Sequence, residues 1–533
     1  MQREMVFELG FTCASGPGAV TVASDGTAFP AEAGKLLGVR LEHEGAAWRL
    51  FVEPTCEVEL GYCTARMAMD LASWDVVYHN GYQSWTDSVE RNPAYTMHDL
   101  RHVPRSIMEK WILDGGGDYA FAYYALERGL QHGFGYCYLR RGDDVLLIGS
   151  LGEDLGLTST YTSLKRGLLV VAREAQERPL AAGESREVLG FALLEGSYGS
   201  CFAEWARLAG IKARPCPALV GFSSWYRHYD DISQGKLLHD LDVFASLLHG
   251  VDTGTCARVF QIDDGYTVVG DWTRPSEERF PDGMGAMAER IREAGLVPGL
   301  WMAPFVCSQD SRLFAEHPDW LLRDEDGELV MTGSHWNGAY ALDTLNPEVR
   351  AYVRESLSLA TRTWGYKLLK LDFLYGACML PHGGMNRGEL IADALELLRE
   401  SAAEGTWFDM CGVPLMSAFG RTEYCRIGCD VGLDWDDQPH MRLLHRERVS
   451  TKSSLGNTCG RAHLNGLAFR NDPDVFFLRE DVKLTNEQRA ALISADAQLG
   501  GVFFTSDDVG AWNEGQRRTW REALATFVAA NAC

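Results

Sequence analysis

From about residue 217 onward, short apolar stretches alternate with amphipathic ones, and no other feature of the sequence constrains the fold as strongly. We predict eight strands, over 218–226, 258–266, 296–305, 366–375, 406–412, 423–430, 467–474 and 500–508. Helices are predicted between and after them, over 235–250, 284–295, 348–365, 388–405, 485–501 and 514–531. Eight such units within about 315 residues fit a (β/α)8 TIM barrel, with a doubly wound parallel sheet as the alternative.

The first part of the chain follows a different pattern. Strand-like stretches such as 47–54, 75–80, 144–151 and 167–173 recur between turn residues, which is typical of an antiparallel sandwich. A helix is expected over 198–210. We therefore predict a multidomain protein with a β domain over 1–197, a helical linker over 198–216 and the barrel over 217–533.

Composition excludes several classes of partner. The net charge of −24 argues against nucleic acid or an anionic membrane as the main partner. No segment has the ~18 apolar residues of a membrane span, and the first residues contain no apolar signal core. The 14 cysteines are scattered along the chain, as reduced thiols would be, so we predict a cytoplasmic location. Cys425 and Cys429 lack a second pair, so no metal site is predicted there.

Polar and aromatic residues follow the predicted strands, at the barrel end where chemistry is expected. A single aspartate after a strand is more often a helix cap than a functional group. Together, however, these residues would form an acidic cup with indole rings, which suits a carbohydrate. In strand order they are Trp225 and Tyr226; Asp263 and Asp264; Trp301; Lys370 and Asp372; Cys411; Arg426 and Asp430; Asn471, Asp472 and Asp474; Asp507 and Asp508.

The fourth predicted strand carries a lysine and an aspartate within an apolar stretch. The two-residue period of a strand places Lys370 and Asp372 on the inner side, and Leu369, Leu371 and Phe373 on the side facing the helices. We expect the ammonium to keep the pKa of Asp372 low and its carboxylate ionised. On residue types alone, Asp372 is either a nucleophile or half of a structural ion pair.

A second carboxyl group is needed to protonate a leaving group, and Asp430 is the best candidate, across the barrel mouth from Asp372. Asp434, Asp436 and Asp437 compete for this role from the following loop. The two carboxyl groups would be ~5–5.5 Å apart in a retaining glycosidase and ~6.5–9.5 Å apart in an inverting one. A Mg²⁺ or Mn²⁺ hydrolase using strand-end aspartates is an alternative.

Several segments also resemble one known family, in the order in which that family has them. They are HNGYQSW (79–85), GFSSWYRHY (221–229), QIDDGY (261–266), GDW (270–272), GLWMAPF (299–305), KLDFLYGA (370–377), CGVPL (411–415), RIGCDV (426–431) and NDPD (471–474). The chain is thereby similar to the family 36 glycoside hydrolases over about residues 79–510. These are melibiase-type α-galactosidases and α-N-acetylgalactosaminidases.

The resemblance implies an N-terminal β-supersandwich, a catalytic (β/α)8 barrel, a retaining mechanism, and no metal or other cofactor. It implies that Asp372 is the nucleophile and Asp430 the acid/base. Asp263 and Asp264 would bind the 4- and 6-hydroxyls of galactose. The remaining residues implied to bind substrate are Trp225, Tyr226, Trp301, Lys370, Cys411, Arg426 and, from the N-terminal domain, Trp85.

The chain departs from the family pattern in two places. It ends at Cys533, so we expect the family's C-terminal β domain to be absent or truncated, and a homo-oligomer is left open. Val-Gly-Leu-Asp-Trp follows Asp430 instead of a Thr-Ala-Pro-like turn, which leaves the aglycone preference open.

The expected substrate is an α-galactoside or an α-N-acetylgalactosaminide. The alternatives are an α-N-acetylgalactosaminidase, a galactosyltransferase of the raffinose-synthase kind, and a sugar-binding protein without catalysis.

Overall fold

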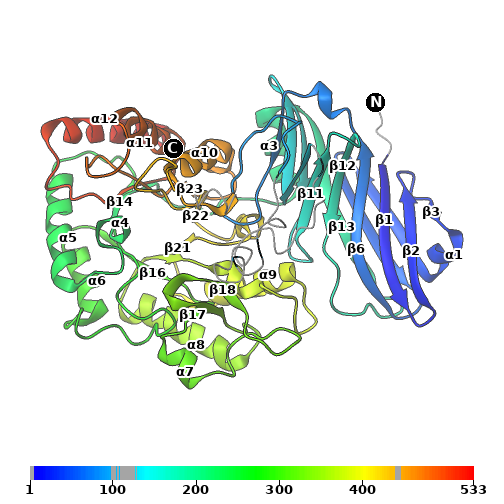
Figure 1. Cartoon of the computed structure of the whole chain (residues 1–533), viewed down its shortest axis with the longest axis horizontal. Helices are drawn as coiled ribbons and strands as arrows, with labels where there is room; N and C mark the ends of the chain where they lie inside the picture. Colours follow the sequence, from blue (N-terminus) through cyan, green and yellow to red (C-terminus); the bar gives the residue numbers. More distant parts are fainter. Residues whose placement is uncertain are drawn as a thin grey trace.

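The computed structural model describes residues 5–97, 104, 107, 127, 129–438 and 446–532. Figure 1 shows antiparallel sheets at one end of the molecule and a parallel sheet surrounded by helices at the other. Among the described helices, none is long and apolar enough to cross a membrane.

Two antiparallel sheets make up the N-terminal part. In spatial order, the first contains β3 (Ala28–Phe29), β2 (Gly16–Ala23), β1 (Met5–Cys13), β6 (Val58–Ala68), β12 (Leu168–Arg173), β11 (Thr158–Ser163) and β8 (Leu130–Phe134). The second contains β4 (Leu37–Glu44), β5 (Ala47–Pro54), β13 (Arg186–Ser197), β10 (Asp144–Ser150), β9 (Tyr136–Arg141) and β7 (Val76–His79). The strands predicted over 47–54, 75–80, 144–151 and 167–173 are confirmed as β5, β7, β10 and β12.

Alternating side chains from these two sheets share one apolar core. Along β1 every second residue is buried, including Phe7 and Leu9, and on β5 Leu50 and Val52 are buried in the same cluster. This alternation is what a strand with one buried face requires. A helix, α1 (Ala31–Leu36), lies between β3 and β4 in the chain.

The second half of the chain forms a parallel sheet that closes on itself. Its strands are β14 (Leu219–Ser223), β15 (Ala257–Ile262), β16 (Val297–Met302), β20 (Leu368–Leu371), β21 (Trp407–Met410), β22 (Tyr424–Arg426), β23 (Arg470–Asp472), β24 (Val475–Phe476) and β25 (Val502–Thr505). β23 pairs with β22 and β24 pairs with β25, while only Pro473 and Asp474 separate β23 from β24. The sheet is therefore barrel-like, and each of the eight predicted stretches contains one of its strands.

Helix α3 precedes the parallel sheet, other helices follow most of its strands, and several helices begin with the caps that their sequences encode. They are α3 (Tyr198–Leu208), α4 (Trp225–His228), α5 (Gln234–Leu248), α6 (Gly283–Glu293), α7 (Arg312–Glu316), α8 (Pro347–Ser358), α9 (Arg387–Ser401), α10 (Thr451–Gly460), α11 (Asn486–Leu499) and α12 (Glu514–Ala530). Reciprocal capping boxes join Asn386 to Glu389 and Thr485 to Gln488 at the starts of α9 and α11. The predicted helices are confirmed, except that 359–363 continue α8 as a π-helical turn.

The sequence pattern did not predict the short helices α1, α4 and α7, the longer helix α10, or a small antiparallel sheet. Helix α10 is rich in Gly, Ser and Thr and has no apolar periodicity, so the pattern that reveals a helix is missing. A small antiparallel sheet, β17 (Val306–Ser308), β19 (Ala339–Ala341) and β18 (Met331–Gly333), interrupts the alternation between β16 and α8. Its three-residue strands are too short to show a period.

One buried arginine joins the two parts of the molecule. Arg461, just after α10, donates to the Asn80 side chain (3.1 Å) and to the carbonyl oxygens of Ser84 (2.6 Å), Gln83 (3.2 Å) and Ile427 (3.0 Å). Residues 80–84 belong to the N-terminal part, and Ile427 follows β22. A single guanidinium therefore satisfies acceptors from both parts.

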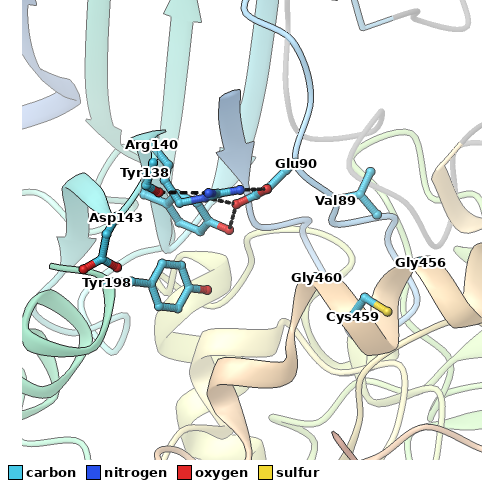
Figure 2. Close-up of a pocket in the computed structure, with 10 residues that line it drawn as sticks. Val89, Glu90, Tyr138, Arg140, Asp143, Tyr198, Gly456, Cys459 and Gly460 are labelled. Atoms are coloured by element: carbon cyan, nitrogen blue, oxygen red, sulfur yellow. Dashed lines mark hydrogen bonds and ion pairs between the residues drawn. The ribbon is translucent and has the colours of Figure 1, made fainter. Parts of the chain in front are cut away.

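A cleft of about 540 Å³ lies beside this junction, between β9, the start of α3 and the end of α10. Figure 2 shows Glu90 at its wall, paired with the Arg140 guanidinium and accepting a hydrogen bond from the Tyr138 hydroxyl at 3.0 Å. The polar groups at this wall therefore already bind one another.

We expect Arg461→Lys to lower the free energy of unfolding by about 2–4 kcal/mol, because one ammonium cannot replace donors to four buried acceptors. Urea unfolding monitored by tryptophan fluorescence measures the change. Arg518→Lys, at an exposed position on α12, is the matched control and should stay within about 0.5 kcal/mol of wild type. A loss from Arg461→Lys as small as the control's would contradict this account of the junction.

Candidate active site

A cavity of about 230 Å³ opens at the carboxyl ends of the parallel strands. Asp263 directly follows β15, Asp372 directly follows β20, and Trp225 lies two residues beyond β14. The complete lining is Trp85, Trp225, Asp263, Asp264, Trp301, His335, Trp336, Lys370, Asp372, Phe373, Cys429, Asp430, Glu447 and Val449. The folded chain thus brings eight of the eleven predicted site residues to one cavity.

Both carboxylate oxygens of Asp372 are held in place. The Trp301 indole donates to Oδ2 at 3.1 Å, and the backbone N–H of Phe373 donates to Oδ1 at 2.8 Å. The backbone N–H of Asp372 itself donates to the Met302 carbonyl oxygen at 2.8 Å, which ties the residue to the neighbouring strand. The result is a buried, oriented carboxylate facing the cavity.

The predicted low pKa of Asp372 is wrong, although Lys370 acts on that carboxyl group in the expected direction. Burial raises the pKa of Asp372 above its usual value, although the nearby Lys370 charge acts to lower it. The Lys370 ammonium forms its ion pair with Asp263, at 3.0 Å, so a structural Lys370–Asp372 pair is not what the fold makes. Desolvation of the Asp372 carboxylate outweighs the attraction of an ammonium that is engaged elsewhere.

Phe373 is also placed differently from the prediction. β20 ends at Leu371, and Phe373 has a left-handed φ of 54°. Its ring therefore turns away from the helices and packs against Trp336 and Trp85, with ring centroids 4.9 and 5.1 Å apart. The period of a strand cannot be extended past the residue where the strand ends.

The neighbouring residues Asp263 and Asp264 have different environments. Asp263 accepts from the Gln261 amide at 3.0 Å in addition to Lys370. Asp264 accepts from the Trp336 indole at 2.8 Å and from the Gly265 N–H at 2.7 Å. Burial raises the pKa of Asp264 to about 6, against the lowering effect of the Trp336 hydrogen bond.

Asp430 lies in the loop after β22, and its side chain is 40% exposed, whereas those of Asp263 and Asp474 are buried. Its Oδ1 is 3.1 Å from the buried Arg426 guanidinium. Arg426 in turn lies 3.2 Å from Asp474, whose pKa is raised to about 7 by burial. Asp474 also accepts from the N–H of Val431, the residue after Asp430, at 2.9 Å.

Three predicted site residues lie behind the cavity wall. Tyr226 donates to Asp474 at 2.5 Å, Cys411 accepts from the Trp85 indole at 3.0 Å, and Arg426 joins Asp430 to Asp474. Cys411 and Arg426 therefore contact residues that line the cavity, whereas Tyr226 contacts Asp474, the partner of Arg426. The competing Asp434, Asp436 and Asp437 do not appear in the described lining of the cavity.

The aspartates after the eighth strand have structural contacts. Asp507 accepts from the backbone N–H groups of Leu478 (2.6 Å) and Arg479 (2.9 Å) and from the Trp512 indole (3.0 Å). Asp508 pairs with Arg227 at 2.9 Å. Hydrogen bonds to a loop backbone and to an indole account for Asp507, and an ion pair accounts for Asp508.

Six lining residues were missed in the sequence analysis as substrate contacts: His335, Trp336, Phe373, Cys429, Glu447 and Val449. These residues lie in loops and short turns, where no strand or helix periodicity indicates which side chains point into the cavity. The sequence offered one sign of such residues: the interval between β16 and β20 is longer than a single connecting helix requires. Within the described residues, no group of three or more His, Cys, Asp or Glu is arranged to hold a metal ion.

Comparison with known proteins gives consistent similarities. The Melibiase family model matches residues 213–376. TtGalA, an α-galactosidase from Thermus thermophilus solved in complex with p-nitrophenyl α-D-galactopyranoside, is 30% identical to this chain. The superposition has a TM-score of 0.70 and covers 91% of this chain and 94% of TtGalA.

Other known proteins share the fold at lower identity or match a shorter segment. The GH36 α-galactosidase AgaA from Geobacillus stearothermophilus is 14% identical, with a TM-score of 0.59 over 97% of this chain and 69% of AgaA. That likeness shows a common fold. Alpha-galactosidase Mel36A from Lactobacillus acidophilus is 33% identical over 114 residues, which are 20% of this chain and 14% of Mel36A. The chain thus spans under a fifth of that curated relative.

The raised pKa of Asp264 predicts a pH-dependent cost to stability. Because its folded pKa of about 6 exceeds the ~3.9 of an unfolded aspartate, the stabilising contribution is full below about pH 4 and is lost as pH rises through 6. Two pKa units correspond to roughly 3 kcal/mol as an upper value. Urea unfolding of Asp264→Asn should therefore show the variant gaining on wild type between pH 4.5 and 7.5.

Asp242→Asn, which removes an exposed carboxyl on α5, is the control for this comparison. The comparison does not depend on how much stability the lost hydrogen bond itself costs, because that loss is present at both pH values. A wild-type-to-Asp264→Asn difference that stays constant with pH would show that burial does not raise this pKa.

Proposed function

Because the chain belongs to family 36 of the glycoside hydrolases, the melibiase type, we propose that it is a retaining exo-α-galactosidase acting on terminal α-D-galactosyl residues. One observation carries the proposal: Asp372 and Asp430 line the same cavity, and they follow strands β20 and β22, which only β21 separates. Relatives point to the substrate class, since TtGalA was solved with stachyose and an AgaA variant with raffinose.

The environments of the two carboxyl groups suit the two roles of a double displacement. Asp372 is buried with both oxygens oriented, as a nucleophile must be. Asp430 is partly exposed, so it can exchange its proton with water between the two steps. We assign Asp372 as the nucleophile and Asp430 as the acid/base.

In the first step, a carboxylate oxygen of Asp372 attacks the anomeric carbon while the bond to the leaving oxygen breaks. The proton of Asp430 passes to that oxygen, and a β-galactosyl ester on Asp372 forms. In the second step, Asp430 takes a proton from water, whose oxygen attacks the same carbon and releases Asp372. Two inversions yield α-galactose with net retention.

The remaining lining residues are assigned to binding. Asp263 and Asp264 accept hydroxyl hydrogen bonds, with Lys370 holding Asp263 in place. Trp225, Trp301 and, from the N-terminal part, Trp85 supply apolar faces for the sugar ring. Tyr226, Cys411 and Arg426 support this layer from behind.

The same family assignment extends to domain organisation. We assign residues 1–197 to a β-supersandwich, 198–216 to a helical linker and 217–533 to a (β/α)8 catalytic barrel. The closure of the parallel sheet through β23 and β24 supports this division.

Asp372→Asn should reduce kcat/KM on p-nitrophenyl α-D-galactoside by at least about 10⁴-fold, because an amide is a poor nucleophile. Release of p-nitrophenol measures the rate, and Asp242→Asn serves as the surface control. NMR of the first-formed wild-type product should show the α-anomer. Activity in Asp372→Asn near that of wild type would overturn the assignment, and β-galactose as the first product would overturn retention.

Asp430→Asn should affect substrates according to their leaving groups. p-Nitrophenolate departs with little help from an acid, whereas the sugar hydroxyl group that leaves from raffinose must be protonated. The loss of kcat/KM should therefore be roughly 10²–10⁴-fold larger on raffinose. Parallel assays with p-nitrophenyl α-N-acetylgalactosaminide, and with sucrose as acceptor, test the aminosugar and transferase alternatives. Equal losses on both galactosides would remove Asp430 from the acid/base role.

A further inference from the structure

Trp336 reaches the cavity from a segment that lies outside the strand and helix alternation. It belongs to a short turn, His335–Asn337, between β18 and β19 of the small antiparallel sheet. The segment connects β16, which carries Trp301, to β20, which Asp372 directly follows. Trp336 lines the cavity beside both residues.

The backbone of this turn is held in a conformation that residues other than glycine rarely adopt. Trp336 and Asn337 have left-handed φ values of 51° and 59°. The Ser308 hydroxyl donates to the Trp336 carbonyl oxygen at 3.0 Å, and Asn337 donates to Asp310 at 2.7 Å. Such backbone conformations persist where the surroundings impose them, and they cluster at functional sites.

The strained turn delivers one specific contact. The Trp336 indole N–H donates to Asp264 Oδ2 at 2.8 Å, while the Gly265 N–H takes Oδ1 at 2.7 Å. The ring itself packs against Phe373 and Trp301, with centroids 4.9 and 6.0 Å apart. Each oxygen of Asp264 thus has one fixed donor and keeps acceptor capacity for a hydroxyl group.

We propose that Trp336 is a positioning residue for substrate recognition, which orients the Asp264 carboxylate and favours its ionised form in the cavity. This inference rests on the proposed function and adds to it a residue outside the motifs that revealed the family. An ionised carboxylate fixed at both oxygens presents its free acceptor directions to one arrangement of sugar hydroxyls. Trp336 would thereby contribute to stereochemical selection.

Several charges surround Asp264 and set the background for this effect. Asp263 and Asp230 act to raise the pKa of Asp264, as burial does, whereas the Trp336 hydrogen bond acts to lower it. Lys370 on β20 and Asp372 directly after it line the cavity, and Asp430 and Glu447 line it from loops. Removing the indole donor should therefore raise the pKa of Asp264 further.

The first test compares Trp336→Phe with Trp320→Phe. Trp320, the control, lies in the same segment between β16 and β20, and its indole donates to the Glu348 carboxylate at 2.9 Å. Trp320→Phe therefore also removes an indole hydrogen bond, but Trp320 is not among the residues that line the cavity. Trp336→Phe should lower kcat/KM on p-nitrophenyl α-D-galactoside roughly 10- to 100-fold and move the acid limb of its pH profile upward by about 0.5–1 unit. Trp320→Phe should leave that limb in place.

A second variant tests the turn rather than the indole. Ser308→Ala removes the hydrogen bond to the Trp336 carbonyl oxygen without touching the cavity, and it should move the acid limb in the same direction by a smaller amount. An acid limb unchanged in both Trp336→Phe and Ser308→Ala would overturn the proposal.

A stability measurement separates this inference from the proposed function. The destabilisation caused by Trp336→Phe should be larger at pH 7.5 than at pH 4.5, because the folded state then binds the Asp264 proton more tightly. In an Asp264→Asn background the same substitution should cost the same at both pH values. Equal pH dependence in the two backgrounds would refute the Trp336–Asp264 coupling, whereas inactivity of wild type toward galactosides would refute the proposed function alone.

Discussion

The cavity depends on the interruption of one strand at Pro473 and Asp474. β23 pairs with β22 before this break and β24 pairs with β25 after it, so the break closes the parallel sheet. Asp474, with a φ of 84°, turns its carboxylate to the Val431 N–H, the Tyr226 hydroxyl and Arg426. The break at Pro473 and Asp474 therefore does two things. It lets the parallel sheet close, and it places the Asp474 carboxylate where it holds the loop that carries Asp430.

Burial dominates the electrostatics of the site. The pKa values of Asp264, Asp372 and Asp474 are all raised, and for each the largest cause is removal from water. The buried cations Lys370 and Arg426 offset part of this cost for Asp372 and Asp474, and hydrogen bonds from Trp336 and Gly265 do so for Asp264. A site of this kind gives up folding stability at neutral pH to keep carboxylates close together, which is the usual compromise at a functional centre.

The N-terminal part contributes to the cavity as well as to the fold. Trp85 lines the cavity, and its indole donates to Cys411 behind the wall, while Arg461 binds the segment that carries Trp85. A substitution of Arg461 would therefore affect the position of Trp85, because Arg461 binds the carbonyl oxygen of the preceding residue, Ser84. Residues from both parts of the chain therefore line one cavity.

Local sequence pattern predicted the eight strands, the principal helices and the strand-end positions of Asp263, Trp301 and Asp372, because periodicity and chain order are local properties. The motifs also singled out Asp372 and Asp430 as a pair. Only the tertiary structure decided that Lys370 pairs with Asp263, that burial raises the pKa of Asp372, and that Trp336 contacts Asp264. Partner choice and desolvation depend on residues about 70 or more positions apart in the chain, and they take effect only when the sheet has closed.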